Sequence, residues 1–99
     1  MGVLMYKIFD NTIIIDKCVE SFNDDILSAI KENKIEHIKF EEGSQLDIVY
    51  MASFVNNKNL KSVDFSPCKK LEKVDFSAFN GCTNLERVCF AGCDSLQVL

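Results

Sequence analysis

Leu60-Lys61-Ser62-Val63-Asp64-Phe65-Ser66 returns eleven residues later, with its apolar positions kept, as Leu71-Glu72-Lys73-Val74-Asp75-Phe76-Ser77. In each copy a leucine precedes a valine and a phenylalanine that alternate with polar residues. Alternation with a period of two predicts a short β-strand. We therefore expect two strands, each with its valine and phenylalanine facing a core and its leucine packed just before the strand.

A longer period of 25 residues encloses this pair of segments. Sliding residues 35–74 onto residues 60–99 gives ten identities in 40 pairs, and nine of the ten fall on apolar or cysteine positions. Chance would give roughly two or three identities from average composition, without regard to polarity. The clustering predicts a structural repeat in which each unit supplies two short strands on opposite walls of a flattened core. The recurring apolar positions are Ile35, Leu60 and Leu85; Ile38, Val63 and Val88; Phe40, Phe65 and Phe90; and Leu46, Leu71 and Leu96.

The first segment of the unit reads L-x-x-V-x-F-x-x-C, which is close to the leucine-rich repeat signature L-x-x-L-x-L-x-x-N/C. The second segment continues into Ala78-Phe79, Cys82 and Leu85. In this pattern the chain resembles the BspA-like, or Treponema pallidum-type, leucine-rich repeats, whose units contain A-F-x-x-C-x-x-L. The resemblance covers about 65 residues, and residues 35–59 match more loosely, with Asn57 in the cysteine place.

The resemblance implies the fold class: an α/β leucine-rich repeat solenoid of about two and a half 25-residue coils, with two short strands in each coil. The repeats would occupy residues 35–99. Their units would be residues 35–59, residues 60–84 and an incomplete unit at residues 85–99.

Residues 1–34 do not repeat, and we expect them to form a cap on the first coil. Residues 3–9 and 12–15 are apolar and rich in β-formers, and the turn pair Asp10-Asn11 between them predicts a β-hairpin. Asn23 has the character of a helix N-cap, and two aspartates follow it where the helix dipole favours anions. The hairpin and this capping helix would cover the open end of the repeats.

The C-terminal sequence predicts an uncovered coil. Leu96-Gln97-Val98-Leu99 begins a second strand, and no A-F-x-x-C turn follows it. An exposed apolar end invites pairing with another chain. We expect either a fragment of a longer repeat array or a homo-oligomer, for example a homodimer, that joins end to end. The predicted oligomer interface consists of Phe90, Leu96, Val98 and Leu99.

Composition limits the class of protein. The 99 residues suit one domain, and 47% hydrophobic with 26% charged residues is typical of a globular chain. The net charge of −4 argues against nucleic acid, which selects basic faces. We find no signal-peptide pattern and no apolar run of the roughly 18 residues that would span a membrane. Together with five cysteines, an odd count, these features predict reduced thiols and a cytoplasmic location, with a surface location if the chain is a fragment.

The cysteines are predicted to be structural. Cys68 and Cys93 lie one period apart at an inward place, and Cys82 occupies another inward turn. Cys89 occupies an outward strand position and is the thiol most open to reaction, whereas Cys18 has no assigned role. Zinc needs convergent, closely spaced ligands, which these cysteines and the single histidine do not offer. We expect no metal and no cofactor, and a disulfide between neighbouring coils is geometrically conceivable.

No catalytic set stands out, so we expect a protein that is not an enzyme. Cys89 and His37 belong to the same predicted wall but to different coils, and no third group accompanies them to orient the histidine. The glycines are isolated turn residues rather than a phosphate-binding loop.

The polar wall of the first strands is the predicted functional surface. The resemblance implies partner binding there, since this wall is the usual binding face of leucine-rich repeat proteins, and similar proteins often serve as adhesins or surface antigens. Mixed charges suit a protein partner, of unknown identity, better than a polyanion. The plainer alternative is a row of solvated strand residues. The rival functions are a self-assembling unit and a redox-sensitive protein that uses its outward thiol. The predicted partner-binding residues are Glu36, His37, Lys39, Lys61, Ser62, Asp64, Glu86, Arg87 and Cys89.

Overall fold

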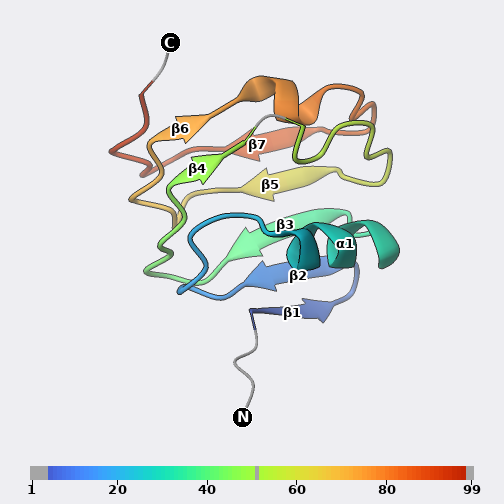
Figure 1. Cartoon of the computed structure of the whole chain (residues 1–99), viewed down its shortest axis with the longest axis horizontal. Coiled ribbons are helices and arrows are strands. Elements are labelled where there is room, and N and C mark those ends of the chain that lie inside the picture. The colour runs from blue at the N-terminus through green and yellow to red at the C-terminus, as the bar shows by residue number, and fades with distance from the viewer. Residues whose placement is uncertain (1–4, 51, 98–99) are drawn as a thin grey trace.

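The computed structural model describes residues 5–50 and 52–97, which form two β-sheets joined by short turns (Figure 1). The larger sheet contains, in spatial order, β1 (Tyr6–Phe9), β2 (Thr12–Ile15), β3 (His37–Phe40), β5 (Ser62–Asp64) and β7 (Arg87–Cys89). It is a mixed sheet, because β1 pairs with β2 in antiparallel orientation and the other pairs are parallel.

The smaller sheet pairs β4 (Ile48–Val49) with β6 (Lys73–Val74) in parallel. The helices are α1 (Asp24–Glu32) and a short 3-10 helix, η1 (Phe76–Phe79). From β3 onward the chain alternates between the two sheets, as can be followed in Figure 1 through β4, β5, β6 and β7. No α-helix in the described ranges has the length and apolar composition needed to cross a bilayer.

The period of the sequence sets the register of each parallel strand pair that the structure describes. His37 lies opposite Thr12 on one side and Ser62 on the other, and Ser62 lies opposite Arg87. The pair of β4 and β6 keeps the same spacing. One period is therefore the distance along the chain between neighbouring parallel strands, and this regularity includes β2.

The predicted fold class, an α/β leucine-rich repeat solenoid with an N-terminal cap, is wrong. The described residues form a small α/β domain with one α-helix and a five-stranded mixed sheet, and its extents are 37 × 31 × 20 Å. The hairpin is not a cap outside the sheet, because β2 pairs in parallel with β3 and is an internal strand. The physical reason is that Ile13 and Ile15 are buried at core positions one period before Ile38 and Phe40.

The hairpin and the helix N-cap predicted in the N-terminal third are confirmed, although β1 begins at Tyr6 and residues 3 and 4 of its predicted strand lie outside the described residues. Asp10 and Asn11 have positive φ angles of 49° and 60°, the conformation that suits a two-residue turn between β1 and β2. Asn23 caps α1, since its Oδ1 accepts the backbone N–H of Ile26 at 2.9 Å. The buried side of α1 packs into the same hydrophobic core as both sheets.

Stacked phenylalanine rings run through the core from one repeat to the next. The Phe65 ring lies between those of Phe40 and Phe90, with centroid distances of 5.5 and 5.3 Å. A second stack joins Phe54 and Phe79 at 5.4 Å. Such pairs contribute about 0.5–1.5 kcal/mol each beyond the area they bury. The stacks tie successive strands together and so hold the outward side chains in fixed rows.

Candidate partner-binding face

Alternate residues of β3, β5 and β7 point away from the core. Ile38 and Val63 are buried, so their neighbours along each strand face outward. The register sets His37, Ser62 and Arg87 in one row across the three strands. We call this side of the larger sheet the outer face. It is defined by His37, Lys39, Ser62, Asp64, Arg87 and Cys89.

A hollow of about 440 Å³ lies over the outer face. Eight of the nine predicted partner-binding residues line it, together with Thr12 and Val63. The ninth, Glu36, adjoins the hollow, because its Oε1 is 3.3 Å from Nζ of Lys61. The structure thus brings the nine predicted residues together at one place on the surface.

Two side-chain contacts join neighbouring strands or their flanks at the outer face. His37 Nδ1 and Ser62 Oγ are 2.6 Å apart, and both side chains are half-buried. The ion pair of Glu36 with Lys61 is partly exposed, and a pair of this kind contributes about 0–1 kcal/mol. The contacts therefore orient side chains more than they stabilise the fold.

Asp64 is the carboxylate on the middle strand of the outer face. Its Oδ1 accepts the backbone N–H of Ser66 at 2.9 Å. This hydrogen bond, the Ser66 side chain and the nearby charges of Lys39 and Arg87 lower the pKa of Asp64 from its ordinary value. Asp64 is therefore ionised at neutral pH, close to two cations. The charged groups that line the hollow are Lys39, Lys61 and Arg87 against Asp64 and Glu86.

Thr12 extends the row of outward side chains onto β2, and it was not predicted to do so. The signal was present in the sequence, because Thr12 precedes His37 by one period and Ile13 precedes Ile38 by the same distance. Phe9 lies opposite Thr12 in the antiparallel pair and is 74% exposed. An aromatic ring therefore stands at the β1 end of the row.

The inward placement of Cys68 and Cys93 is confirmed, since both thiols are buried. Burial raises the pKa of Cys68 to about 12 and also raises the pKa of Cys93. Cys93 Sγ donates to the main-chain oxygen of Phe65 at 3.1 Å. Cys82 is half-buried, and its Sγ donates to the main-chain oxygen of Phe54 at 3.0 Å. These small side chains fill the core, and the thiols of Cys82 and Cys93 each form a hydrogen bond with the preceding repeat.

The other two cysteines differ from this set. Cys89 is half-buried on the outer face, and Cys18 is exposed in the turn after β2. All five cysteines are free thiols, so the structure forms no disulfide between neighbouring repeats. Within residues 5–50 and 52–97, no group of three or more His, Cys, Asp or Glu side chains is close enough to hold a metal ion.

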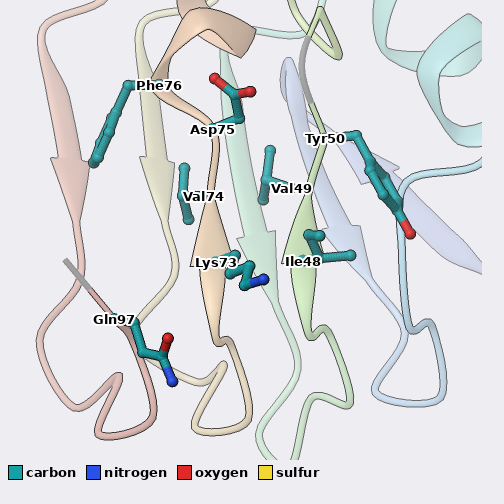
Figure 2. Close-up of a pocket in the computed structure, with 8 residues that line it drawn as sticks. All are labelled: Ile48, Val49, Tyr50, Lys73, Val74, Asp75, Phe76 and Gln97. Atoms are coloured by element: carbon teal, nitrogen blue, oxygen red, sulfur yellow. The ribbon is translucent and has the colours of Figure 1, made fainter. Parts of the chain in front are cut away.

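A second hollow, of about 520 Å³, lies over the smaller sheet (Figure 2). Two exposed aromatic side chains flank it: Tyr50 is 57% exposed and Phe76 is 62% exposed. Figure 2 shows the two rings on opposite sides of the β4 and β6 strands. This hollow was not predicted. Its remaining lining residues are Ile48, Val49, Lys73, Val74, Asp75 and Gln97.

The prediction that Phe76 faces inward is wrong. β6 ends at Val74, because Asp75 Oδ1 accepts the backbone N–H of Ser77 at 3.0 Å and starts η1. The Ser77 hydroxyl donates to the same oxygen at 2.6 Å. This local capping breaks the alternation of the strand, so Phe76 turns toward solvent. Its ring still meets the Phe90 ring edge-on, with centroids 6.0 Å apart.

The residues of the predicted oligomer interface fall into two groups. Phe90 and Leu96 are half-buried and pack against the core. Val98 and Leu99 lie outside the described residues. In the described part of the chain, β7 is the last strand of the larger sheet and β6 the last strand of the smaller one.

Comparison with protein-family models, with curated proteins and with solved structures finds no match for this chain. The resemblance to BspA-like leucine-rich repeats stays a prediction.

Proposed function

We propose that this chain is a non-catalytic protein-protein interaction module that binds its partner through the outer face. The observation that carries the proposal is the hollow over β3, β5 and β7, which eight of the nine predicted partner-binding residues line. Its side chains come from segments that lie one and two periods apart in the sequence. A concave surface with fixed rows of charged and polar groups supports recognition of another macromolecule.

The charges of the hollow favour a protein partner over a nucleic acid. Asp64 and Glu86 stand among the cations that line it, and the whole chain carries a net charge of −4. A phosphate backbone would meet both carboxylates as well as the cations, which weakens the electrostatic attraction on which such complexes depend. A protein surface can match positive and negative positions separately.

The contact of His37 with Ser62 supports a binding role rather than a catalytic one. A serine nucleophile needs a histidine base that a third group holds in the correct tautomer. Among the described residues, no carboxylate forms a hydrogen bond with His37. We therefore propose that the pair positions donors at the surface.

The size of the outer face favours a transient complex. Specific interfaces of standard size bury about 800 Å² on each partner. Three strands of three or four residues supply only part of that area. We therefore expect affinities on the order of micromolar rather than nanomolar.

The test is selection of binders from a random peptide library displayed on phage, followed by affinity measurements on variants of the chain. The double variant Lys61→Glu/Arg87→Glu reverses two charges of the hollow. The matched control Lys70→Glu/Lys73→Glu makes the same charge change at and just before β6, on the smaller sheet. We expect selected peptides to bind the outer-face variant at least about tenfold more weakly and the control variant normally.

Two results would contradict the proposal. One is that selected peptides bind the outer-face variant as tightly as the original chain while circular dichroism shows both to be folded. The other is that the control variant loses the same affinity, because the effect would then come from net charge rather than from the outer face.

We propose self-assembly as a second candidate function, supported by the surface around β6 and β7. Phe76 is 62% exposed and its ring contacts that of Phe90, which is itself half-buried. An exposed apolar group at the last strands of both sheets favours association with a second copy. Light scattering over a concentration series tests this candidate. A dimer that Phe76→Ser dissociates would support it, and a monomer at every concentration would contradict it.

A further inference from the structure

The charges of the hollow also point to the class of partner, an inference that rests on the function proposed above. The chain carries a net charge of −4. In the hollow, by contrast, three cationic side chains stand against two carboxylates. Glu36 beside the hollow offsets Lys61, so the attraction for anionic groups is local to the cations that no ion pair holds among the described residues, Lys39 and Arg87.

Lys39 and Arg87 are the cations most open to a ligand. Both side chains are exposed on the outer face. Lys61, by contrast, is 3.3 Å from the Glu36 carboxylate. Within the described ranges neither Lys39 nor Arg87 forms an ion pair. Asp64 lies near enough to both cations for their charges to lower its pKa, but it forms no ion pair with either, so a ligand carboxylate can reach them without breaking a direct contact.

Arg87 has a second donor beside it. Ser62 lies directly opposite Arg87 in the register of β5 and β7, and its Oγ is 2.6 Å from His37 Nδ1. When the His37 Nδ1–H donates to this oxygen, the Ser62 O–H is free to donate outward. A guanidinium and a hydroxyl in one row suit the acceptor oxygens of a carboxylate, which guanidinium groups bind with defined geometry.

We propose that the partner is an acidic polypeptide segment with separated aspartate or glutamate side chains, one of which binds at Arg87 and Ser62 with Lys39 nearby. The carboxylates of Asp64 and Glu86 select for separated charges, because they repel a continuous run of anions over the same hollow. The occupant is thus a protein segment of moderate negative charge.

Three fluorescein-labelled nonapeptides of serine and threonine test the inference by fluorescence anisotropy at low ionic strength. They carry glutamate, glutamine or lysine at the third and seventh positions. We expect the glutamate peptide to bind about tenfold more tightly than the glutamine peptide, and the lysine peptide to bind most weakly. Added salt should weaken the glutamate complex, because the contact lies at the surface.

Variants and a thiol readout locate the contact. Arg87→Gln should weaken binding of the glutamate peptide about tenfold and remove most of the preference for the glutamate peptide over the glutamine peptide. The matched control Lys73→Gln, on the smaller sheet, should leave the affinities for both peptides unchanged. Bound peptide should slow alkylation of Cys89, which lines the hollow. The exposed thiol of Cys18 lies outside the hollow and should react at its unliganded rate.

Equal or tighter binding of the glutamine or lysine peptide would overturn the inference. So would a ten-nucleotide single-stranded DNA that binds more tightly than the glutamate peptide and loses affinity in Arg87→Gln. In either case library-selected peptides that still depend on the outer face leave the proposed function intact. If no selected peptide depends on the outer face, the proposed function itself fails.

Discussion

The middle of the molecule, around β5, and its C-terminal part, around β7, contain equivalent residues of the repeat that differ in burial. Phe65 and Leu71 are 0% exposed, whereas Phe90 and Leu96, which follow them by one period, are half-buried. The side chains keep their direction, since the rings of Phe65 and Phe90 stack within 3° of parallel. The position in the repeat therefore fixes where a side chain points, and neighbours on both sides fix how deeply it is buried.

The N-terminal part is covered as well as the middle. Ile13 and Ile15 of β2 are buried, although β2 belongs to a hairpin that differs from the later repeats. β1 pairs along one side of β2, and α1 contributes Ile26 and Ile30 to the same core. The contrast with the part around β7 shows that covering elements, rather than the repeat itself, decide burial.

The largest expected effect tests this contrast with one substitution at two equivalent positions. Phe65→Ala should lower the free energy of unfolding by about 3–5 kcal/mol, because it removes a buried ring and leaves a cavity. Phe90→Ala should lower it by about 1–2 kcal/mol, since part of its ring already meets water. Urea denaturation followed by circular dichroism measures both values.

A domain of this size has only about 5–15 kcal/mol of stability, so Phe65→Ala can fail to fold. The pair Phe65→Leu and Phe90→Leu then gives the same comparison with smaller losses. Equal losses at the two positions would show that the two sites are equally buried in solution, which contradicts the structure.

Alkaline pH should separate the middle from the C-terminal part through their thiols. The pKa of Cys68 is raised from 9.0 to about 12, so the folded state keeps its proton while the unfolded chain ionises. The stabilising contribution is complete below pH 9 and is lost as the pH rises from 9 toward 12. The free energy of unfolding should fall less steeply over this range in Cys68→Ala than in the original chain.

Cys93→Ala should flatten the same pH dependence less than Cys68→Ala. Cys93 is 9% exposed and Cys68 is 0% exposed, and burial is the main cause that raises the pKa of each thiol. A pH dependence that neither substitution changes would mean that both thiols are solvated in solution.

Thiol modification should follow the same order of exposure. With iodoacetamide on the native protein, Cys18 and Cys89 should react first, because Cys18 is exposed and Cys89 is half-buried on the outer face. Cys82 is half-buried like Cys89, but burial raises the pKa of Cys82 and of Cys93 and each thiol donates to a main-chain oxygen, so both should react more slowly. Cys68 should react only through unfolding. Peptide mass spectrometry over time gives each rate. More than two fast-reacting thiols would contradict the inward placement of the other three.

The smallest expected effect concerns stability at the proposed binding surface. Arg87→Glu should change the free energy of unfolding by less than about 0.5 kcal/mol, because the Arg87 side chain is exposed on the outer face. The control Lys73→Glu should change the free energy of unfolding by an equally small amount. Thermal denaturation measures both. A large loss in Arg87→Glu alone would mean that this side chain serves the fold, and its effect on binding would then need a different interpretation.

The sequence was informative where the 25-residue period and the strand alternation agree. They predicted outward placement of the nine candidate residues, of which the structure gathers eight in one hollow. Turn and cap chemistry likewise predicted the hairpin at Asp10-Asn11 and the N-cap at Asn23, because both depend on local backbone geometry.

The sequence was less informative where tertiary pairing overrides a local pattern. The match of Ile13 to Ile38 was hidden because residues 1–34 otherwise differ from the repeats, so β2 was assigned to a cap and the fold class was wrong. Phe76 was misplaced because alternation was extended through Asp75, whose capping of Ser77 ends the strand. The second hollow follows from that exposed ring and from Tyr50.

Backbone amide chemical-shift mapping tests whether the outer face is the binding site. The ¹⁵N-labelled chain would be titrated with the nonapeptide that carries two glutamates. We predict that the largest shift changes fall on β3, β5 and β7, near His37, Ser62 and Arg87. Largest changes around Tyr50 and Phe76, in the second hollow, would mean that the peptide binds the smaller sheet and not the outer face.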